Sequence, residues 1–437
     1  MTKILLVGSG AREHALFKAL SRSPEAPAIH VYGSTRNPGL SAQAAAYEAG
    51  SLTDPGRIVE FAREHGSGLA LIGPEAPLEA GVVDALAEAG VPAAGPGREQ
   101  ARIETSKGFA RDLLAKYGIP GSPAYRRFAE AEKAEPFLAE LAGRYVVKAD
   151  GLMGGKGVKI AGEHLADDRE ALAWCREITD SGSGFVVEEL CEGPEFSLFT
   201  FTDGDTVVHA PLVHDHKRAY EGDAGPNTGG MGSYTLPDHR LPFVTEKDFQ
   251  TAASTNERTL EALASETGAP YRGILYGGFM AVADGIRLIE YNARLGDPEC
   301  LNLLALHEGD FVEAVRGMAL GRLAPEALLF RREASVCKYL VPEGYPDRPE
   351  KLFPIDLSGL PDCRDLYLGS VDESEGRLLG AGSRALAFAA TGATLDEAER
   401  KAEDLCLRVK APLYHRSDIG TEALLEERIA LIRRLRP

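Results

Sequence analysis

Short apolar runs alternate with helical patterns over the first hundred residues, and this alternation constrains the fold more than any other feature. Strand-like runs at 4–7, 29–32 and 69–72 are each followed by a helical pattern, and the last of these patterns ends at Gly90. Strands that alternate with helices at this spacing predict a doubly wound parallel sheet. The turn at 95–97 marks a natural boundary, so we expect an N-terminal α/β domain over residues 1–100.

The pattern changes after this boundary. Strand-like runs joined by the glycine turns at 203–205 and 284–285 predict β-hairpins, with helices between them. From about residue 333, β-type runs precede a helical pattern at 395–409. We therefore expect an α/β and α+β multidomain chain. Its central domain spans 101–330, with 121–187 as a lid-like subdomain, and a small β-rich C-terminal domain spans 331–437.

Composition limits the classes of partner. With 437 residues the chain is too long for a single hydrophobic core. A net charge of -18 argues against binding to nucleic-acid backbones or anionic membranes. No apolar run reaches the roughly 20 residues that span a bilayer, and the six cysteines form no CxxC pair. We expect a cytoplasmic enzyme with small-molecule substrates and neither nucleic-acid nor membrane partners.

A glycine-rich turn, Gly8-Ser9-Gly10, joins the first predicted strand to the first predicted helix. It does not complete a dinucleotide-binding fingerprint, because Glu13 stands where the third glycine belongs and the second strand ends without an acidic residue. Two glycines still let backbone amides approach an anion at a helix N-terminus. A phosphate-bearing substrate and a tight turn without a ligand both stay open.

Glu75 follows the strand-like run at 69–72, at the carboxyl edge where wound sheets bind ligands. A carboxylate at this edge suits sugar hydroxyls or an amine. The alternative is an acid that complements the dipole at the start of a helix.

The stretch from Lys148 to Gly157 is the most informative in the chain. A lysine at the end of a strand precedes a loop with four glycines and a second lysine, Lys156. Glycines let amides wrap phosphate oxygens, and lysines supply compact positive charge. The loop lacks the GxxxxGK[ST] pattern of a P-loop, so it indicates a glycine lid over a triphosphate. An ordinary hairpin turn is the alternative.

Glu290 and Asn292 stand two apart on a predicted strand, so their oxygens share a face. Hard oxygen donors beside phosphates are what Mg²⁺ prefers. Arg294 follows on that face with a fork suited to a carboxylate or phosphate. A surface ion pair with Asp297 or Glu299 is its alternative. Upstream, the acidic stretch 188–195 suits either an adenosine-binding hinge or a solvated turn.

Two further segments contain polar residues on predicted loops. In the run 214–218, two histidines and Asp215 favour substrate contacts or a hydrogen-bonded turn over metal ligation, because no third ligand is in sight. The glycine-rich run 225–232 predicts a loop that exposes its backbone toward substrate.

Together these segments resemble the phosphoribosylamine–glycine ligase (glycinamide ribonucleotide synthetase) family of the ATP-grasp superfamily. The resemblance rests on GSGAREHAL, GPEAPL, SKGFARDLL, VVKADGLMGGKGV, DHKRAYEGDAGPNTGGMGSY and IEYNARLGDPE, in order along the chain. It implies a pre-ATP-grasp N-terminal domain that binds substrate, a central ATP-grasp domain and a C-terminal domain. It also implies that ATP phosphorylates glycine and that the amine of 5-phosphoribosylamine attacks the glycyl phosphate, in purine biosynthesis.

The resemblance assigns roles by position. Catalytic roles fall on Lys148, Lys156 and Arg294. ATP would be bound by Lys107, Lys148, Gly154, Gly155, Lys156, Gly157, Glu188, Glu189, Leu190 and Glu195. Glycine and phosphoribosylamine would be bound by Gly10, Asn37, Gly39, Glu75, Asp215, Lys217, Asn227, Thr228, Gly229, Gly230, Arg294, Gly296 and Asp297. Glu290 and Asn292 would hold Mg²⁺ (or Mn²⁺). The chain is expected to be a monomer or weak homodimer.

The chain departs from the family pattern at a few positions. Arg36 is unfamiliar in the loop after the second strand, Leu295 replaces the usual Phe, and Cys300-Leu301 replaces the commoner Thr-Gln. Three other functions remain as alternatives. They are an ATP-grasp ligase for another amine or acid, a nucleotide-binding regulator with a dead site, and an NAD-dependent oxidoreductase.

Overall fold

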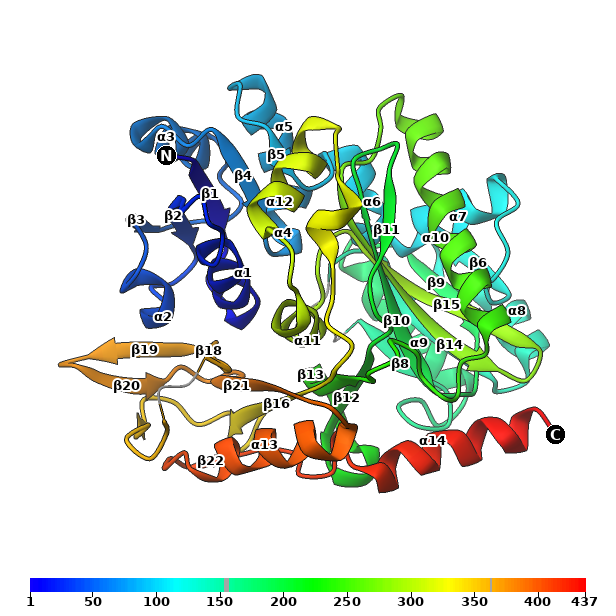
Figure 1. Cartoon of the computed structure of the whole chain (residues 1–437). Helices are drawn as coiled ribbons and strands as arrows, with labels where there is room; N and C mark the ends of the chain where they lie inside the picture. The colour runs from blue at the N-terminus through cyan, green and yellow to red at the C-terminus, as the bar shows by residue number, and fades with distance from the viewer. Residues whose placement is uncertain (153–156, 362–363) are drawn as a thin grey trace.

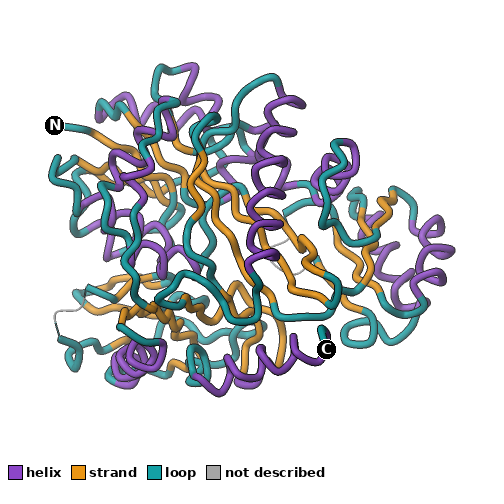
Figure 2. The backbone as a smooth tube through the Cα atoms, turned by 45° about the vertical axis from the view of Figure 1, so that its right-hand side comes forward, coloured by secondary structure: helices purple, strands orange, loops and turns teal. Residues whose placement is uncertain are grey.

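The computed structural model describes residues 1–152, 157–361 and 364–437 (Figure 1). The predictions for Gly154, Gly155 and Lys156 lie outside the described residues. Two sheets and their helices make up the central part of the chain, flanked by an N-terminal sheet and a C-terminal sheet (Figures 1 and 2).

The N-terminal sheet is parallel and wound on both faces, as the alternating pattern predicted. Its strand order is β3-β2-β1-β4-β5. The strands are β1 (Lys3–Val7), β2 (Ala28–Gly33), β3 (Ala46–Ala49), β4 (Leu69–Ile72) and β5 (Ala93–Ala94). The helices are α1 (Ala11–Ser21), α2 (Pro38–Ser41), α3 (Pro55–His65), α4 (Glu75–Glu79) and α5 (Val82–Glu88). The order changes direction at β1, so the turns after β1 and β4 meet at one edge.

A small antiparallel sheet, β6-β9-β7-β8, forms the first half of the central region. Its elements are β6 (Tyr125–Phe128), η1 (Ala131–Ala134), α8 (Glu135–Leu141), β7 (Tyr145–Ala149), β8 (Val158–Ile160), α9 (Asp168–Asp180) and β9 (Phe185–Glu189). The sheet has its own apolar core around Phe137, Val147 and Phe185.

A larger sheet, β11-β10-β14-β15, forms the second half and contains both predicted hairpins. Its strands are β10 (Glu195–Thr202), β11 (Val207–His209), β14 (Gly273–Val282) and β15 (Gly285–Asn292). The associated helices are α6 (Arg98–Thr105), α7 (Lys107–Lys116), α10 (Glu246–Thr267), α11 (Glu299–Leu306), α12 (Phe311–Leu320) and η3 (Pro325–Leu328). Ser106 ends α6 and caps α7, and its hydroxyl accepts a bond from Phe109 N.

The C-terminal sheet has the order β12-β13-β16-β21-β18, and β22 also pairs with β16. Its strands are β12 (His214–Tyr220), β13 (Ala224–Thr235), β16 (Ala334–Pro342), β18 (Leu366–Leu368), β21 (Leu386–Gly392) and β22 (Leu413–Tyr414), with η2 (Glu221–Asp223) between the first two. A second sheet contains β17 (Pro354–Ile355), β19 (Val371–Ser374) and β20 (Arg377–Gly380). Helices α13 (Leu395–Leu407) and α14 (Glu422–Leu435) complete the region.

The runs 214–218 and 225–232 differ from the prediction, because they lie in the paired strands β12 and β13 and not in loops. The physical reason is a close approach to β16. A Cβ on Gly232 would overlap Cys337 O, so glycine at this position lets β13 pair with β16. The sequence pattern had been interpreted as a loop here. The two strands come from the middle of the chain and extend the C-terminal sheet.

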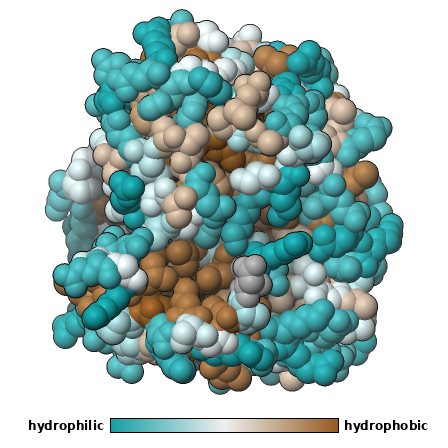
Figure 3. Space-filling view, turned by 60° about the vertical axis from the view of Figure 1, so that its left-hand side comes forward, coloured by the Kyte–Doolittle hydropathy of each residue, from teal (hydrophilic) through white to brown (hydrophobic). Residues whose placement is uncertain are grey.

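The face in Figure 3 is mostly hydrophilic, with a recess of hydrophobic side chains in its lower half. Over the part of the chain that the structure describes, we find no helix that is both long enough and apolar enough to cross a membrane.

Candidate active site

A buried ion-pair triad lies where the small sheet meets α7. Arg111 donates Nε and Nη2 to the two carboxylate oxygens of Glu188, at 2.7 and 2.9 Å. Lys148 Nζ lies 2.8 Å from Glu188 Oε2 and 3.0 Å from Ile289 O. Burial alone would raise the pKa of Glu188, but Arg111 and Lys148 lower it to about 2. The carboxylate therefore fixes Lys148 at the end of β7.

This triad changes the interpretation of Glu188. The resemblance placed Glu188 at adenosine, whereas its side chain is 3% exposed and both oxygens contact cations of the protein. Arg111 was missed by the sequence analysis. Its spacing could have identified it, because Arg111 stands four residues after Lys107 and therefore lies on the same face of the helix.

Lys107, in the first turn of α7, lies beside the glycine-rich loop. Its Nζ donates to Gly151 O at 2.9 Å. Burial lowers the pKa of Lys107, with Glu290 opposing that shift and Lys148 adding to it. Asp150 accepts from Gly108 N and Ser106 Oγ, both at 3.2 Å, and so holds the described start of the loop against α7.

Hydrogen bonds of Glu189 and Leu190 hold the segment that follows β9 against the edge of the small sheet. Glu189 Oε1 accepts from Ala124 N at 3.0 Å, and Leu190 N donates to Arg144 O at 2.9 Å. If Leu190 binds adenine through its backbone, its carbonyl is the group left for that contact. Gly157 O accepts from Ala149 N at 2.8 Å.

Glu290 and Asn292 lie on one face of β15, as predicted. Burial alone would raise the pKa of Glu290, but Lys217, Lys148 and Lys107 lower it, so the carboxylate is ionised. Lys217 Nζ lies 3.5 Å from Glu290 Oε1. An ionised carboxylate and an amide oxygen two residues apart form a donor set that fits a hard divalent cation.

Arg294 lies beside acidic residues of two helices, α4 and α6. Its Nη2 is 2.9 Å from Glu104 Oε1 and 3.1 Å from Asn292 Oδ1. Its Nε is 3.3 Å from Glu75 Oε2, but no hydrogen bond forms, and among the described residues this buried N–H has no other partner. The predicted alternative partners, Asp297 and Glu299, make no ion pair with Arg294 in the described part of the chain. Arg294 therefore keeps a donor for a ligand.

Glu104 was also missed by the sequence analysis. It lies on the buried face of α6, where it accepts from Ala293 N at 2.7 Å and forms an ion pair with Arg294. Burial raises the pKa of Glu104, and Arg294 opposes the shift. The available signal was helical spacing, because Glu104 stands three and four residues after the buried Ala101 and Gln100.

The N-terminal glycine turn is filled by a side chain of the protein itself. Glu13 Oε2 accepts from Gly10 N at 2.6 Å, and its Oε1 lies 2.6 Å from Arg12 Nε. A Cβ on Gly8 or Gly73 would overlap the Glu13 side chain. Glu13 therefore occupies the space that the third glycine of a dinucleotide fingerprint leaves open, which opposes the oxidoreductase alternative.

Asn37 and Gly39 join the N-terminal region to the C-terminal sheet. Asn37 Nδ2 donates to Ser9 O at 2.9 Å and to Leu368 O at 2.8 Å, and its Oδ1 accepts from Gly39 N. A Cβ on Gly39 would overlap the buried ring of His14. The side chain of Asn37 is thus engaged within the protein, and its predicted role at a substrate would act through the loop's backbone.

Strand β12 points Asp215 and Lys217 toward the site. Lys217 Nζ contacts Glu195 Oε2 at 2.8 Å and lies 3.9 Å from Asp215 Oδ2. Burial raises the pKa of Asp215 to about 7, against the opposing effect of Lys217. These contacts bring three predicted ligand-binding residues, Glu195, Asp215 and Lys217, into one cluster with Glu290.

The histidines of β12 lie on its other face. His214 Nδ1 is 2.6 Å from Glu195 O, and the rings of His214 and His216 pack against Tyr234. Burial lowers the pKa of both imidazoles well below the ordinary value, so both are neutral. Within the described ranges, no group of three or more His, Cys, Asp or Glu side chains is arranged to hold a metal ion.

The hairpin β12–β13 and the segment after β15 supply the remaining predicted substrate residues. Thr228 Oγ1 donates to Lys217 O at 2.8 Å and accepts from Gly230 N at 3.0 Å. Asn227 pairs with Arg218 across the hairpin. Opposite it, Gly296 lies against the Glu299 carboxylate, and Asp297 accepts from Tyr339 Oη at 2.5 Å.

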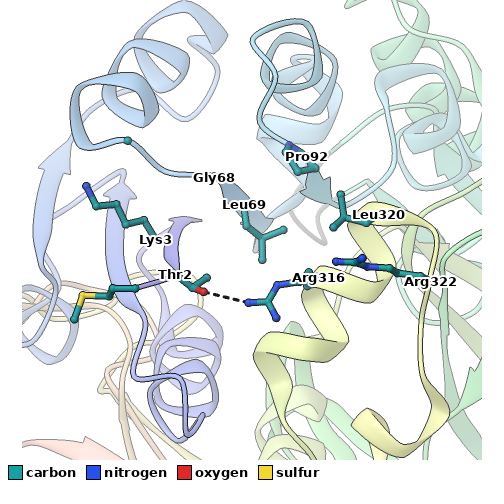
Figure 4. A pocket seen from close by; sticks show the side chains of 10 residues that line it. Thr2, Lys3, Gly68, Leu69, Pro92, Arg316, Leu320 and Arg322 are labelled. Atoms are coloured by element: carbon teal, nitrogen blue, oxygen red, sulfur yellow. Dashed lines mark hydrogen bonds between the residues drawn. The ribbon is translucent and has the colours of Figure 1, made fainter.

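A cavity of about 440 Å³ lies away from this cluster, at the amino-terminal edge of the N-terminal sheet (Figure 4). Thr2, Lys3 and Leu69 line one side, and Arg316, Leu320 and Arg322 line the other. Arg316 bonds to Thr2 and Glu25. Because ligands of wound sheets bind at the carboxyl edge, this cavity is not the candidate site.

The two central sheets, with cationic side chains and an acidic strand end between them, define an ATP-grasp enzyme. Three family models match the chain, namely the phosphoribosylglycinamide synthetase N domain (2–104), ATP-grasp (A) domain (105–300) and C domain (335–422). The chain belongs to the phosphoribosylglycinamide synthetase family and is an ATP-dependent ligase.

Individual relatives cover nearly the whole chain. Phosphoribosylamine–glycine ligase of Methanoregula boonei is 48% identical over 99% of this chain and 100% of its own length. The enzyme of that name from Pyrococcus horikoshii is 44% identical over 99% and 98%.

Solved structures agree with this fold. The crystal structure of phosphoribosylamine–glycine ligase from Thermotoga maritima aligns with a TM-score of 0.80 at 30% identity, over 95% of this chain and 100% of that one. A biotin carboxylase from Campylobacter jejuni aligns with a TM-score of 0.75 at 14% identity, over 97% and 95%, which shows the fold alone.

Proposed function

We propose that this chain joins glycine to 5-phosphoribosylamine while ATP is converted to ADP and phosphate, in de novo purine biosynthesis. The observation that carries the proposal is the buried Arg294, which follows Glu290 and Asn292 along the chain. Its Nε–H has no hydrogen-bond partner among the described residues, although the Glu75 carboxylate lies 3.3 Å away. A carboxylate bound by Arg294 would lie beside the groups that handle the transferring phosphoryl group.

Two bond exchanges make up the reaction. In the first, an oxygen of the glycine carboxylate bonds to the γ-phosphorus of ATP, and the bond between that phosphorus and the β–γ bridging oxygen breaks to release ADP. In the second, the amine of phosphoribosylamine bonds to the acyl carbon and loses a proton, and the carbon–oxygen bond to phosphate breaks. Neither exchange needs a nucleophile from the protein.

The contribution of the chain is charge and orientation. Lys107 and Lys148 would neutralise the transferring phosphoryl group, because both lie close enough to Glu290 to lower its pKa. Among the described residues, Lys148 pairs with Glu188 and Lys107 pairs with no acid. Mg²⁺, or Mn²⁺, held by Glu290 and Asn292 would supply further positive charge to phosphate oxygens. Glu75, 3.3 Å from Arg294, would lie beside the bound glycine.

An omission assay tests the whole proposal. Phosphate release from ATP is expected only when both glycine and phosphoribosylamine are present, since acyl phosphate formation needs the acid and its discharge needs the amine. Sustained turnover without glycine would overturn the assignment and favour an ATP-grasp ligase for another acid. A monomer or weak homodimer in the cytoplasm stays part of the proposal.

Arg294→Lys is expected to raise the KM for glycine at least tenfold, because an ammonium cannot make the planar two-point contact with a carboxylate. The matched control is Arg102→Lys on α6, where Arg102 is half-exposed, pairs with Glu99 at 3.1 Å and lies over the Phe109 ring. Steady-state kinetics with glycine varied would decide, and an unchanged KM would remove Arg294 from glycine binding.

A further inference from the structure

Arg384 extends from the loop between β20 and β21 toward two segments of the candidate site. Its Nη1 donates to Gly229 O at 2.6 Å, Gly230 O at 3.0 Å and Asp297 O at 2.8 Å. Its Nη2 donates to Asp297 Oδ2 at 2.8 Å. One guanidinium of the C-terminal region therefore gathers four oxygens from two separate stretches of chain.

These oxygens would repel one another without the cation. Three are carbonyl oxygens whose dipoles point at a common centre, and the fourth carries the charge of Asp297. The Arg384 guanidinium is also held over the Tyr339 ring, 4.4 Å from its centroid, and Tyr339 Oη bonds to Asp297. Because Arg384 is only 17% exposed, water offers little screening of that repulsion.

The two segments also approach each other closely. Gly230 has a φ of +106°, and a Cβ there would lie 2.5 Å from Pro298 Cδ. The backbone at 229–230 thus fits against 297–298 only with glycine at this position. The glycine allows the two segments to pack together, and the positive charge of Arg384 stabilises that packing.

Each segment leads directly to a residue assigned to substrate. Thr228, next to Gly229, bonds to Lys217 O, and Asp297 follows Arg294 by three residues. The ATP side is built from other elements, since Lys107, Lys148 and Glu188 lie on α7, β7 and β9. Loss of the Arg384 contacts would therefore weaken the binding of glycine and phosphoribosylamine more than the binding of ATP.

We propose that Arg384 is a positioning residue through which the C-terminal region holds the 229–230 and 297 segments in their substrate-binding arrangement. The inference rests on the proposed function for its kinetic readout. It adds the chain beyond residue 331 to the substrate half of the site, to which β12 and β13 of the C-terminal sheet already contribute.

Arg384→Met is the test variant. Its KM for phosphoribosylamine is expected to rise at least tenfold, while its dissociation constant for ATP stays within twofold of that of the parent protein. Arg384→Lys should recover part of the loss, because an ammonium restores the charge but reaches fewer of the four oxygens. Arg377→Met, an exposed arginine on β20, is the matched control and should change neither quantity.

Hydrogen–deuterium exchange provides a readout that needs no substrate. Amides at 229–232 and 296–297 are expected to exchange at least threefold faster in Arg384→Met, with those of α7 unchanged. Unchanged exchange, or equal increases in KM for all three substrates together with a lower Tm, would overturn the inference. An inactive parent protein would instead refute the proposed function, and exchange alone would then decide the role of Arg384.

Discussion

Glu290→Gln is expected to lower kcat at least 100-fold while the protein remains folded. Glutamine keeps the shape of the side chain and removes its charge. That charge lies among Lys217, Lys148, Lys107 and Arg294, which together keep the carboxylate ionised. A divalent cation contributes several kcal/mol to phosphoryl transfer, and each 1.4 kcal/mol corresponds to about tenfold in rate, so loss of the cation's carboxylate ligand accounts for the expected decrease.

Two measurements separate loss of the cation from loss of structure. Titration with Mn²⁺ in the presence of ATP, followed by electron paramagnetic resonance, should show a weaker site in Glu290→Gln while its circular dichroism spectrum matches that of the parent protein. Asp284→Asn is the control, because Asp284 lies at the turn of the same hairpin and pairs with Arg287 at the surface. Normal Mn²⁺ affinity and normal kcat in Glu290→Gln would exclude Glu290 as a metal ligand.

The fold was largely predictable because its periodicities are local. The alternation over residues 1–94 fixed the wound sheet, and the turns at 203–205 and 284–285 fixed two hairpins. The β12–β13 hairpin was not predicted, because its glycines serve the packing of β13 on β16, a hundred residues later in the chain. Non-local pairing of this kind leaves no local pattern.

The residues of the candidate site also divide into those that local spacing predicts and those that it does not. Glu290 and Asn292 were predictable from spacing on one strand, and Arg294 from its position after them. Glu104 and Arg111 were missed because each is a charged residue on a buried helical face, and only the fold brings its partner to it. Charge complementarity between distant segments is the information that a single sequence lacks.

Glu188→Gln is expected to lower the free energy of unfolding at pH 7 by about 3–5 kcal/mol, the usual cost of breaking a buried ion pair by removing one partner. The variant keeps two cations, Arg111 and Lys148, buried around a neutral amide. Activity should also fall, since Lys148 would lose the 2.8 Å contact that orients it. Thermal unfolding and kcat measured on the same preparations would test both effects.

The effect depends on pH with a definite sign. Arg111 and Lys148 lower the pKa of Glu188 from 4.5 to about 2 in the folded protein. A group with a lowered folded pKa stabilises the fold above its unfolded pKa and loses that contribution as the pH falls toward the folded value. About 1.4 kcal/mol per pKa unit makes the contribution about 3 kcal/mol, lost between about pH 4.5 and about pH 2.

The difference in Tm between the parent protein and Glu188→Gln should therefore be constant from pH 7 to about pH 5 and shrink as the pH falls further. The control is Glu140→Gln, because Glu140 pairs with Arg126 at 2.8 Å with both side chains more than half exposed. Exposed pairs contribute about 1 kcal/mol or less. A pH-independent difference, or one no larger than that of Glu140→Gln, would mean that Glu188 does not anchor the buried triad and that Lys148 is oriented by Ile289 O alone.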